Sequence, residues 1–204
     1  MDFNDTPEEA KFRKEAYDWL KANAPLKEGP KDSWRAASEE EGLKEVKAWQ
    51  KKLHDGGWAC LHWPKQYGGR ESTPIERVIW GQEVSKFKVP GGYLEIGQGM
   101  AGPVMMMYAT EEQKERYLPP LATGEEIWCQ LFSEPAAGSD VAGIKTKAEL
   151  DGDTWTINGQ KVWTSGAHFS DYGILVTRSD PTVAKHKGLT FFFVDMKSPG
   201  IEVK

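Results

Sequence analysis

The sequence predicts an α+β protein in which an N-terminal bundle of α-helices precedes an antiparallel, barrel-like β-domain. Two observations lead to this prediction. Before residue 125, a Ser or Thr is followed three residues later by Glu or Gln at four helix starts. After residue 126, short apolar runs alternate with turn pairs such as Asn158-Gly159, as in antiparallel sheets. We therefore expect a helical domain at 1–125 and a β-domain at 126–204.

Apolar residues at helical spacing follow each of these start signals. Helix-breaking residues predict where the helices end. The first helix should end at Pro25, the second at Gly56-Gly57 and the last at Pro119-Pro120. The four start residues are Thr6, Ser38, Thr73 and Thr110.

The segment 97–102 matches the dinucleotide-binding pattern G-x-G-x-x-G. That pattern needs a buried strand directly before it, within a βαβ unit. Here a Pro- and Gly-rich stretch at 90–93 precedes it, and Pro103 follows its last glycine. We therefore expect a flexible loop that opens an apolar helix at 104–108, rather than a nucleotide site.

Strands are expected where β-branched and aromatic residues cluster between turns. The last residues, 201–204, also read as the start of a strand, so the chain either closes with an edge strand or is a piece of a longer polypeptide. The other expected strands lie at 127–132, 154–157, 161–165, 173–177 and 190–196.

Composition argues against several classes of function. A formal net charge of −5 and a pI near 5.5 argue against nucleic acid as a partner. The apolar runs are too short for membrane insertion, and the N-terminus lacks an apolar signal segment, which favours a cytoplasmic location. Cys60 and Cys129 are too few for a disulfide framework, and the histidines lack metal-binding spacing, so no metal site is expected.

Two segments of the expected β-domain combine small hydroxyl residues, glycine and an aromatic ring. They read FSEPAAGSD at 132–140 and KVWTSG at 161–166. An extended aromatic cofactor with a phosphate tail needs hydroxyl and backbone N–H groups for its polar edges and an indole for its ring face. Gly138 allows backbone amides to approach an anion, while Ser139 and Asp140 suit the cap of a short helical turn. These segments predict a site for a cofactor of this kind.

Glu134 lies inside the first of these segments, but we do not expect it to be a catalytic base. A base must be aimed at a substrate proton. Glu134 precedes Pro135 at the expected exit of a strand, a position where a carboxylate more often accepts hydrogen bonds from backbone amides. Most tryptophans are likewise expected to pack in cores.

With NGQK at 158–161 between them, the two segments resemble the flavin-binding middle domain of the acyl-CoA dehydrogenases. The resemblance covers nearly the entire chain. It implies FAD as cofactor, an acyl-CoA thioester oxidised between Cα and Cβ, and electron-transfer flavoprotein as a partner. Ser139 also matches a family position near the CoA moiety. The positions that match flavin-contacting segments of the family are Gln130, Leu131, Phe132, Ser133, Gly138, Ser139, Trp163, Thr164 and Ser165.

The chain departs from the family pattern in three ways. Serine stands at 133 and 165 where threonine is frequent, and Gln130 replaces a frequent aromatic residue. The family's C-terminal helical bundle, which carries the catalytic glutamate and builds the homotetramer, has no counterpart. We therefore nominate no catalytic base here and expect a fragment or incomplete subunit of a dehydrogenase, homo- or hetero-oligomeric at full length.

Three alternatives stay open. A flavin oxidase or monooxygenase shares the same scaffold and differs in its reactivity with oxygen. A non-catalytic partner subunit would contribute only part of a shared flavin or acyl-CoA site. A β-domain that binds sugars or peptides through exposed tryptophan is the third.

Overall fold

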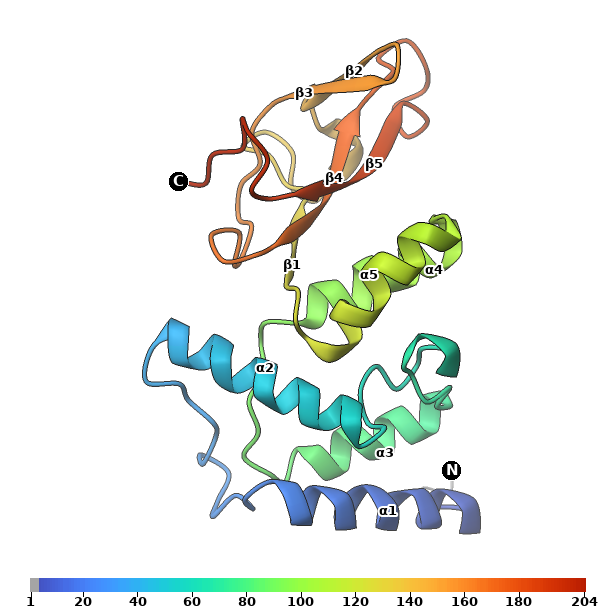
Figure 1. Cartoon of the computed structure of the whole chain (residues 1–204), viewed down its shortest axis with the longest axis vertical. Helices are drawn as coiled ribbons and strands as arrows, with labels where there is room; N and C mark the ends of the chain where they lie inside the picture. Colours follow the sequence, from blue (N-terminus) through green and yellow to red (C-terminus); the bar gives the residue numbers. More distant parts are fainter. Residues whose placement is uncertain (1–3) are drawn as a thin grey trace. The chain divides into compact units, whose positions relative to one another are not determined.

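The computed structural model describes residues 4–204, which form two compact units (Figure 1). The first unit extends to Tyr93 and resumes at Pro103–Glu125, and the second comprises Leu94–Gly102 and Glu126–Lys204. The N-terminal residues 1–3, which entered the argument against a signal segment, lie outside the described residues. A domain boundary between 125 and 126 stays a prediction.

Helices build the first unit, and all four predicted start signals are confirmed. Each start hydroxyl accepts a hydrogen bond of 3.2 Å from the backbone N–H three residues later. This bond satisfies one of the backbone donors that a helix start leaves unpaired. The helices are α1 (Pro7–Asn23), α2 (Glu39–Asp55), α3 (Pro74–Val84), α4 (Gly102–Tyr108) and α5 (Glu111–Thr123).

The predicted end of the last helix at Pro119-Pro120 is wrong. Both prolines lie inside α5, which continues to Thr123 and is capped by Gly124 at φ +76°. Leu118 and Leu121 are almost fully buried on either side of the prolines. Their burial therefore outweighs the hydrogen bonds that the prolines cannot donate.

The predicted loop at 97–102 is also wrong. Gly97–Ala101 forms a π-helical turn, in which the Gly102 N–H donates to the Gly97 carbonyl, and it continues directly into α4. Gly97, Ala101 and Met105 are buried, so packing compensates for the poor helix propensity of the glycines. A helix without a preceding strand also excludes the dinucleotide-binding interpretation.

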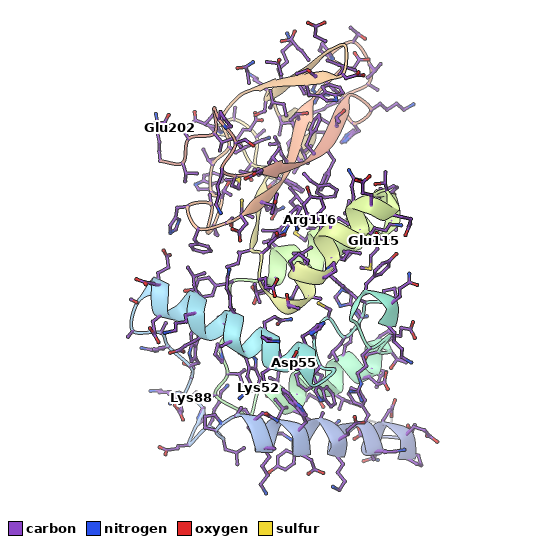
Figure 2. All side chains as sticks on the ribbon, in the orientation of Figure 1. Lys52, Asp55, Lys88, Glu115, Arg116 and Glu202 are labelled. Carbon is purple, nitrogen blue, oxygen red and sulfur yellow. The ribbon has the colours of Figure 1, made fainter. Side chains whose placement is uncertain are left out.

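Tryptophans form much of the core of the first unit, as predicted. Trp58 and Trp80 stack with ring centroids 4.6 Å apart, and the Arg70 guanidinium lies 4.1 Å from the centroid of Trp58. Lys52 lies near the end of α2 (Figure 2). Its ammonium is 5.9 Å from the centroid of the Trp49 ring. Such stacking and cation–π contacts add to the burial of the indoles.

The second unit is a five-stranded mixed sheet (Figure 1). Strand β4 is central: it pairs along its whole length with β5, and on its other side first with β1 and then, at Arg178, with β2. A hairpin joins β2 to β3. The strands are β1 (Trp128–Leu131), β2 (Lys147–Asp151), β3 (Thr154–Asn158), β4 (Tyr172–Arg178) and β5 (Leu189–Asp195).

The α+β class is confirmed, whereas the barrel-like, purely antiparallel sheet is not. Strands β1 and β2 both run parallel to β4, and only the β2–β3 and β4–β5 pairs are antiparallel. Among the described residues the pairings leave the sheet open. Residues 132–171 separate β1 from β4, which is ample length for the crossover that a parallel pair requires.

Two predicted strands are absent from the described part of the chain. Residues 161–165 and 201–204 belong to no strand, whereas β2, with its alternating charges, was not predicted. Both cysteines are buried, and burial raises the pKa of Cys60 to about 12 and also raises the pKa of Cys129.

Candidate functional site

The two hydroxyl- and aromatic-containing segments lie side by side in the second unit. The Val162 N–H donates to the Ser133 carbonyl over 2.9 Å, and the Lys161 ammonium donates to the Phe132 carbonyl over 3.0 Å. Almost thirty positions apart in sequence, the segments are joined directly by these two bonds. The structure therefore brings the residues flanking Ser133 and Trp163 together.

The first segment leaves the sheet through a tight turn. Gln130 and Leu131 end β1 and are half-buried, and Phe132 and Ser133 follow. Glu134 and Ala137 then exchange two backbone hydrogen bonds of 2.8 and 3.0 Å. After this turn, Gly138 is half-buried and Ser139 is exposed.

The second segment carries Trp163, the most exposed tryptophan among the described residues. Trp163 is 81% exposed, and its backbone has φ +56°, the left-handed region that residues with a Cβ rarely adopt. A Cβ at Gly138 would lie 3.6 Å from the Trp163 ring. The indole face is thus open to solvent on a backbone that is strained.

Four candidate hydroxyls have no hydrogen-bond partner within residues 4–204. The Thr164 Oγ1 atom is buried and unpaired. The hydroxyls of Ser133, Ser139 and Ser165 make no hydrogen bond to another described residue. A buried hydroxyl without a partner costs free energy unless a ligand or water satisfies it. These side chains are therefore available to a polar ligand.

One of the predicted roles is wrong. Asp140 precedes the short 3₁₀ turn Val141–Gly143 but does not cap it with its side chain, and its carboxylate pairs with Lys185. The Phe132 ring packs edge-on against Phe191, with centroids 6.3 Å apart, beside the core residues Ala137 and Val176. A flavin contact at Phe132 stays a prediction.

Glu134 has the structural role that the sequence predicted. Its carboxylate accepts hydrogen bonds from the backbone N–H groups of Lys145, at 2.6 Å, and Thr146, at 2.9 Å. It also forms a 2.9 Å ion pair with Lys161. Burial alone would raise the pKa of Glu134, but these three residues outweigh it and lower the pKa to about 2.

Lys161 is the residue whose role sequence reasoning missed. Its side chain is 7% exposed, which is rare for lysine, and burial lowers its pKa despite the opposing effect of Glu134. A lysine next to valine and tryptophan, with no acidic residue nearby in sequence, was the available signal. Such a lysine often finds its partner on another segment.

A basic groove of about 520 Å³ lies elsewhere in the same unit. It is lined mainly by Lys145, Lys147, Arg178 and Lys185, with Ile144, Pro181 and Val183 as apolar neighbours. Lys145 also donates its backbone N–H to Glu134, and Lys185 pairs with Asp140, which follows Ser139. The groove is therefore linked to the first segment through both residues.

The residues of the two segments fit a flavin. An indole face exposed by a strained backbone can stack on an aromatic ring, and the unpaired Thr164 hydroxyl offers a polar contact. The described residues hold no group of three or more His, Cys, Asp or Glu side chains suited to a metal ion. None of the helices in the described chain is long and apolar enough to cross a bilayer.

Comparison with known proteins identifies the family. Residues 6–125 match the sequence profile of the acyl-CoA dehydrogenase N-terminal domain, and residues 129–204 match that of the acyl-CoA dehydrogenase middle domain. The chain belongs to the acyl-CoA dehydrogenase family. Both candidate segments fall within the part that matches the middle domain.

Individual acyl-CoA dehydrogenases match over most of the chain. The acyl-CoA dehydrogenase IpdE1 of Mycobacterium tuberculosis is 39% identical over 166 residues, which cover 81% of this chain and 43% of the relative. A structure described as the Tcur3481-Tcur3483 steroid ACAD has a TM-score of 0.78 and 32% identity. The ChsE4-ChsE5 complex from Mycobacterium tuberculosis has a TM-score of 0.74 and 30% identity. Each structural match covers 98% of this chain and 50% of the other, so the chain spans about half the length of these proteins.

Proposed function

We propose that the chain forms the N-terminal and middle part of an FAD-dependent acyl-CoA dehydrogenase that oxidises the Cα–Cβ bond of an acyl-CoA thioester. When bound, FAD would supply the acceptor for the hydride leaving Cβ. The residues of this chain would bind and orient the flavin ring. The proposed activity, substrate and cofactor of the chain are inferred from its membership of the family and from the geometry of the two segments.

One observation carries the proposal: the 2.9 Å hydrogen bond between the Val162 N–H and the Ser133 carbonyl. It joins Val162, the residue before the exposed Trp163, to Ser133, whose hydroxyl is unpaired. We propose that Trp163 stacks on the flavin ring and that Ser133, Thr164 and Ser165 donate to its polar atoms. The remaining proposed flavin contacts are Gln130, Leu131, the backbone of Phe132, Gly138 and Ser139.

The substrate would be held by Ser139, which is also a proposed flavin contact, and by residues of the basic groove. We propose that the exposed Ser139 hydroxyl contacts the CoA moiety. The basic groove is suited to the phosphate groups of CoA, because Lys145, Lys147 and Arg178 contribute positive charge to its wall. Neutralising Lys145 and Lys147 together should weaken acyl-CoA binding without changing flavin binding.

Glu134, the buried carboxylate of the first segment, is poorly suited to act as the catalytic base. Glu134 is buried, accepts three hydrogen bonds and has a pKa of about 2. A carboxylate so stabilised in its charged form is a weak base, because effective bases have a pKa near the working pH. We therefore propose that Glu134 supports the site and that the base is not among the residues nominated here.

The proposal is tested by purifying the full chain with FAD and recording its visible absorbance. Protein-bound flavin should absorb in the visible region, and a dye-coupled assay with acyl-CoA substrates should report turnover when a base is present. The substrates should include straight, branched and steroid-bearing acyl-CoAs, since one similar structure is described as a steroid ACAD. A folded, colourless chain that does not take up FAD would contradict the proposal.

A second candidate is a non-catalytic partner subunit that shares its site with another chain. The similarity to the ChsE4-ChsE5 complex favours it, because that structure is a complex of differently named proteins. Co-purification of a second chain carrying a base would support it. Oxygen consumption on addition of substrate would instead indicate an oxidase or monooxygenase, and reduction of electron-transfer flavoprotein would identify the proposed electron acceptor.

A further inference from the structure

The left-handed backbone at Trp163 must be held in place by its surroundings. A residue with a Cβ at φ +56° costs about 1–3 kcal/mol and persists only where neighbouring contacts determine it. The indole itself is 81% exposed and supplies little of that restraint. The restraint must therefore come from the backbone on either side: the turn that follows, in which the Ala167 N–H donates to the Thr164 carbonyl, and the contacts of Lys161 and Val162 before it.

Lys161 provides the strongest of these contacts. Its ammonium donates to the Phe132 carbonyl at 3.0 Å and to the Glu134 Oε1 atom at 2.9 Å. Glu134 is in turn fixed by the backbone amides of Lys145 and Thr146, which directly precede β2. One buried ion pair thus ties three stretches of chain together: the residues after β1, the residues before β2 and the strained segment.

A close backbone approach reinforces the same junction. A Cβ at Gly159 would lie 2.6 Å from the Thr146 Cα atom, so only glycine fits there without movement. The chain therefore passes tightly over Thr146 just before it reaches Lys161. The close approach at Gly159 therefore fixes the backbone that leads to Lys161, and the amides of Lys145 and Thr146 fix Glu134.

We propose that the Glu134–Lys161 ion pair is a positioning device, which holds the Trp163 indole and the Ser133 hydroxyl in register for the flavin ring. The mechanical part of this proposal, that the ion pair orders Trp163, holds with or without a cofactor. The flavin part rests on the proposed function. Neither residue is assigned a contact with the flavin, because the carboxylate and the ammonium are more than nine-tenths buried and already paired.

The nearby charges identify a matched control. Lys197 also forms an ion pair in the same unit, with Asp171 at 3.1 Å, but its side chain is 76% exposed. Exposed ion pairs contribute little to stability, whereas removing one partner of a buried pair leaves an uncompensated charge. Lys161→Met and Lys197→Met therefore remove the same chemical group from a buried and an exposed position.

The test measures Trp163 directly and flavin binding separately. The indole N–H resonance of Trp163, identified by its loss in Trp163→Phe, should shift or broaden in K161M and stay in place in K197M. The dissociation constant of FAD should rise at least about tenfold in K161M, and the visible band of bound flavin should change shape, as expected when the support of a binding group is removed. Lys161→Arg, which restores charge and donors, should recover most of the affinity.

The outcomes separate the two proposals. If K161M folds and leaves both the Trp163 resonance and the FAD affinity unchanged, the positioning role is wrong, even if the variant melts earlier. If the wild-type chain binds no FAD, the proposed function fails, while the resonance still tests the ordering of Trp163. Should K161M not fold, Lys161→Gln, which keeps a donor of shorter reach, gives the same comparison.

Discussion

Trp163 combines two properties that a residue rarely has together, a strained backbone and a side chain that buries almost nothing. Its φ of +56° would suit glycine, and its indole is 81% exposed. In folding terms both are disadvantages. Strained backbone conformations are often found at binding sites, where the geometry that the fold maintains is used to bind a ligand.

Trp163→Gly should therefore weaken flavin binding without lowering the stability of the fold. The left-handed backbone costs glycine nothing extra and little burial is lost, so the melting temperature should stay level or rise. Flavin affinity should fall because the stacking surface is gone. Thermal unfolding followed by circular dichroism and an FAD titration check the two effects.

Trp155→Gly serves as the comparison for this prediction. Trp155 is 39% exposed and packs against Phe192 with ring centroids 5.2 Å apart, so its loss should lower the melting temperature. A marked loss of stability in the Trp163 variant as well would show that this indole holds the fold together.

Glu134 makes the stability of the second unit depend on pH. Its pKa is lowered to about 2 in the folded chain, from an ordinary value of 4.5. Its contribution to the free energy of unfolding is therefore complete above pH 4.5 and is lost as the pH falls toward 2. Glu134→Gln should cost about 3–5 kcal/mol near neutral pH, because Lys161 loses its buried partner.

Urea unfolding of wild type and E134Q across this pH range checks the assignment. The difference between the two should shrink as the pH drops from 4.5 to 2. A difference that stays constant with pH would mean that the Glu134 charge is not the cause.

At the scale of elements, α5 continues through two prolines, which usually end a helix, because its leucines are buried. Pro119 is exposed within the helix and donates no N–H to the preceding turn. Pro119→Ala restores that donor without disturbing the buried Leu118. The free energy of unfolding should rise by up to about 3 kcal/mol, measured by urea denaturation.

Pro74→Ala is the control for this prediction. Pro74 occupies the first turn of α3, where a missing N–H has no intrahelical acceptor, so the change should be nearly neutral or slightly destabilising. An equal gain at both sites would point to a general effect of removing proline.

Local signals predicted the elements that local forces determine. Hydroxyl residues before Glu or Gln predicted all four helix starts, since the capping bonds span only three residues. The end of α5 and the parallel pairing of β1 with β4 depend on burial and on contacts between distant segments. The β-rich pattern at 161–165 was misread because its residues serve the ion pair and the exposed indole instead of a sheet.

The candidate site was predictable to a similar degree. The two segments were recognisable as hydroxyl, glycine and indole in a fixed order, and Glu134 as an acceptor for backbone amides. The role of Lys161 was not, because its partner lies 27 positions away in sequence. The packing of the Phe132 ring against Phe191 was not predictable either, because nothing local shows which side of a strand end faces the core.

At the scale of the whole molecule, the proposed flavin residues all belong to the second unit. A cavity made in the first unit should therefore lower stability without changing flavin affinity. Leu20, fully buried in α1, is suited to this test. Leu20→Ala should lower the free energy of unfolding by about 2–5 kcal/mol.

The FAD dissociation constant of folded L20A, measured well below its melting temperature, should equal that of wild type. Saturating wild type with FAD at about 100 times its dissociation constant should add about 2.7 kcal/mol of stability. A weakened flavin site in folded L20A would instead implicate the first unit in binding.

The burial of both cysteines makes the chain well suited to site-directed spectroscopy. Thiol reagents attack the thiolate, and the pKa of Cys60 is about 12, with that of Cys129 also raised. A maleimide dye or spin label should therefore leave the native chain almost untouched at neutral pH. A single cysteine introduced at a surface position such as Glu149 would accept the probe alone, so motions of the second unit could be followed without first removing either natural thiol.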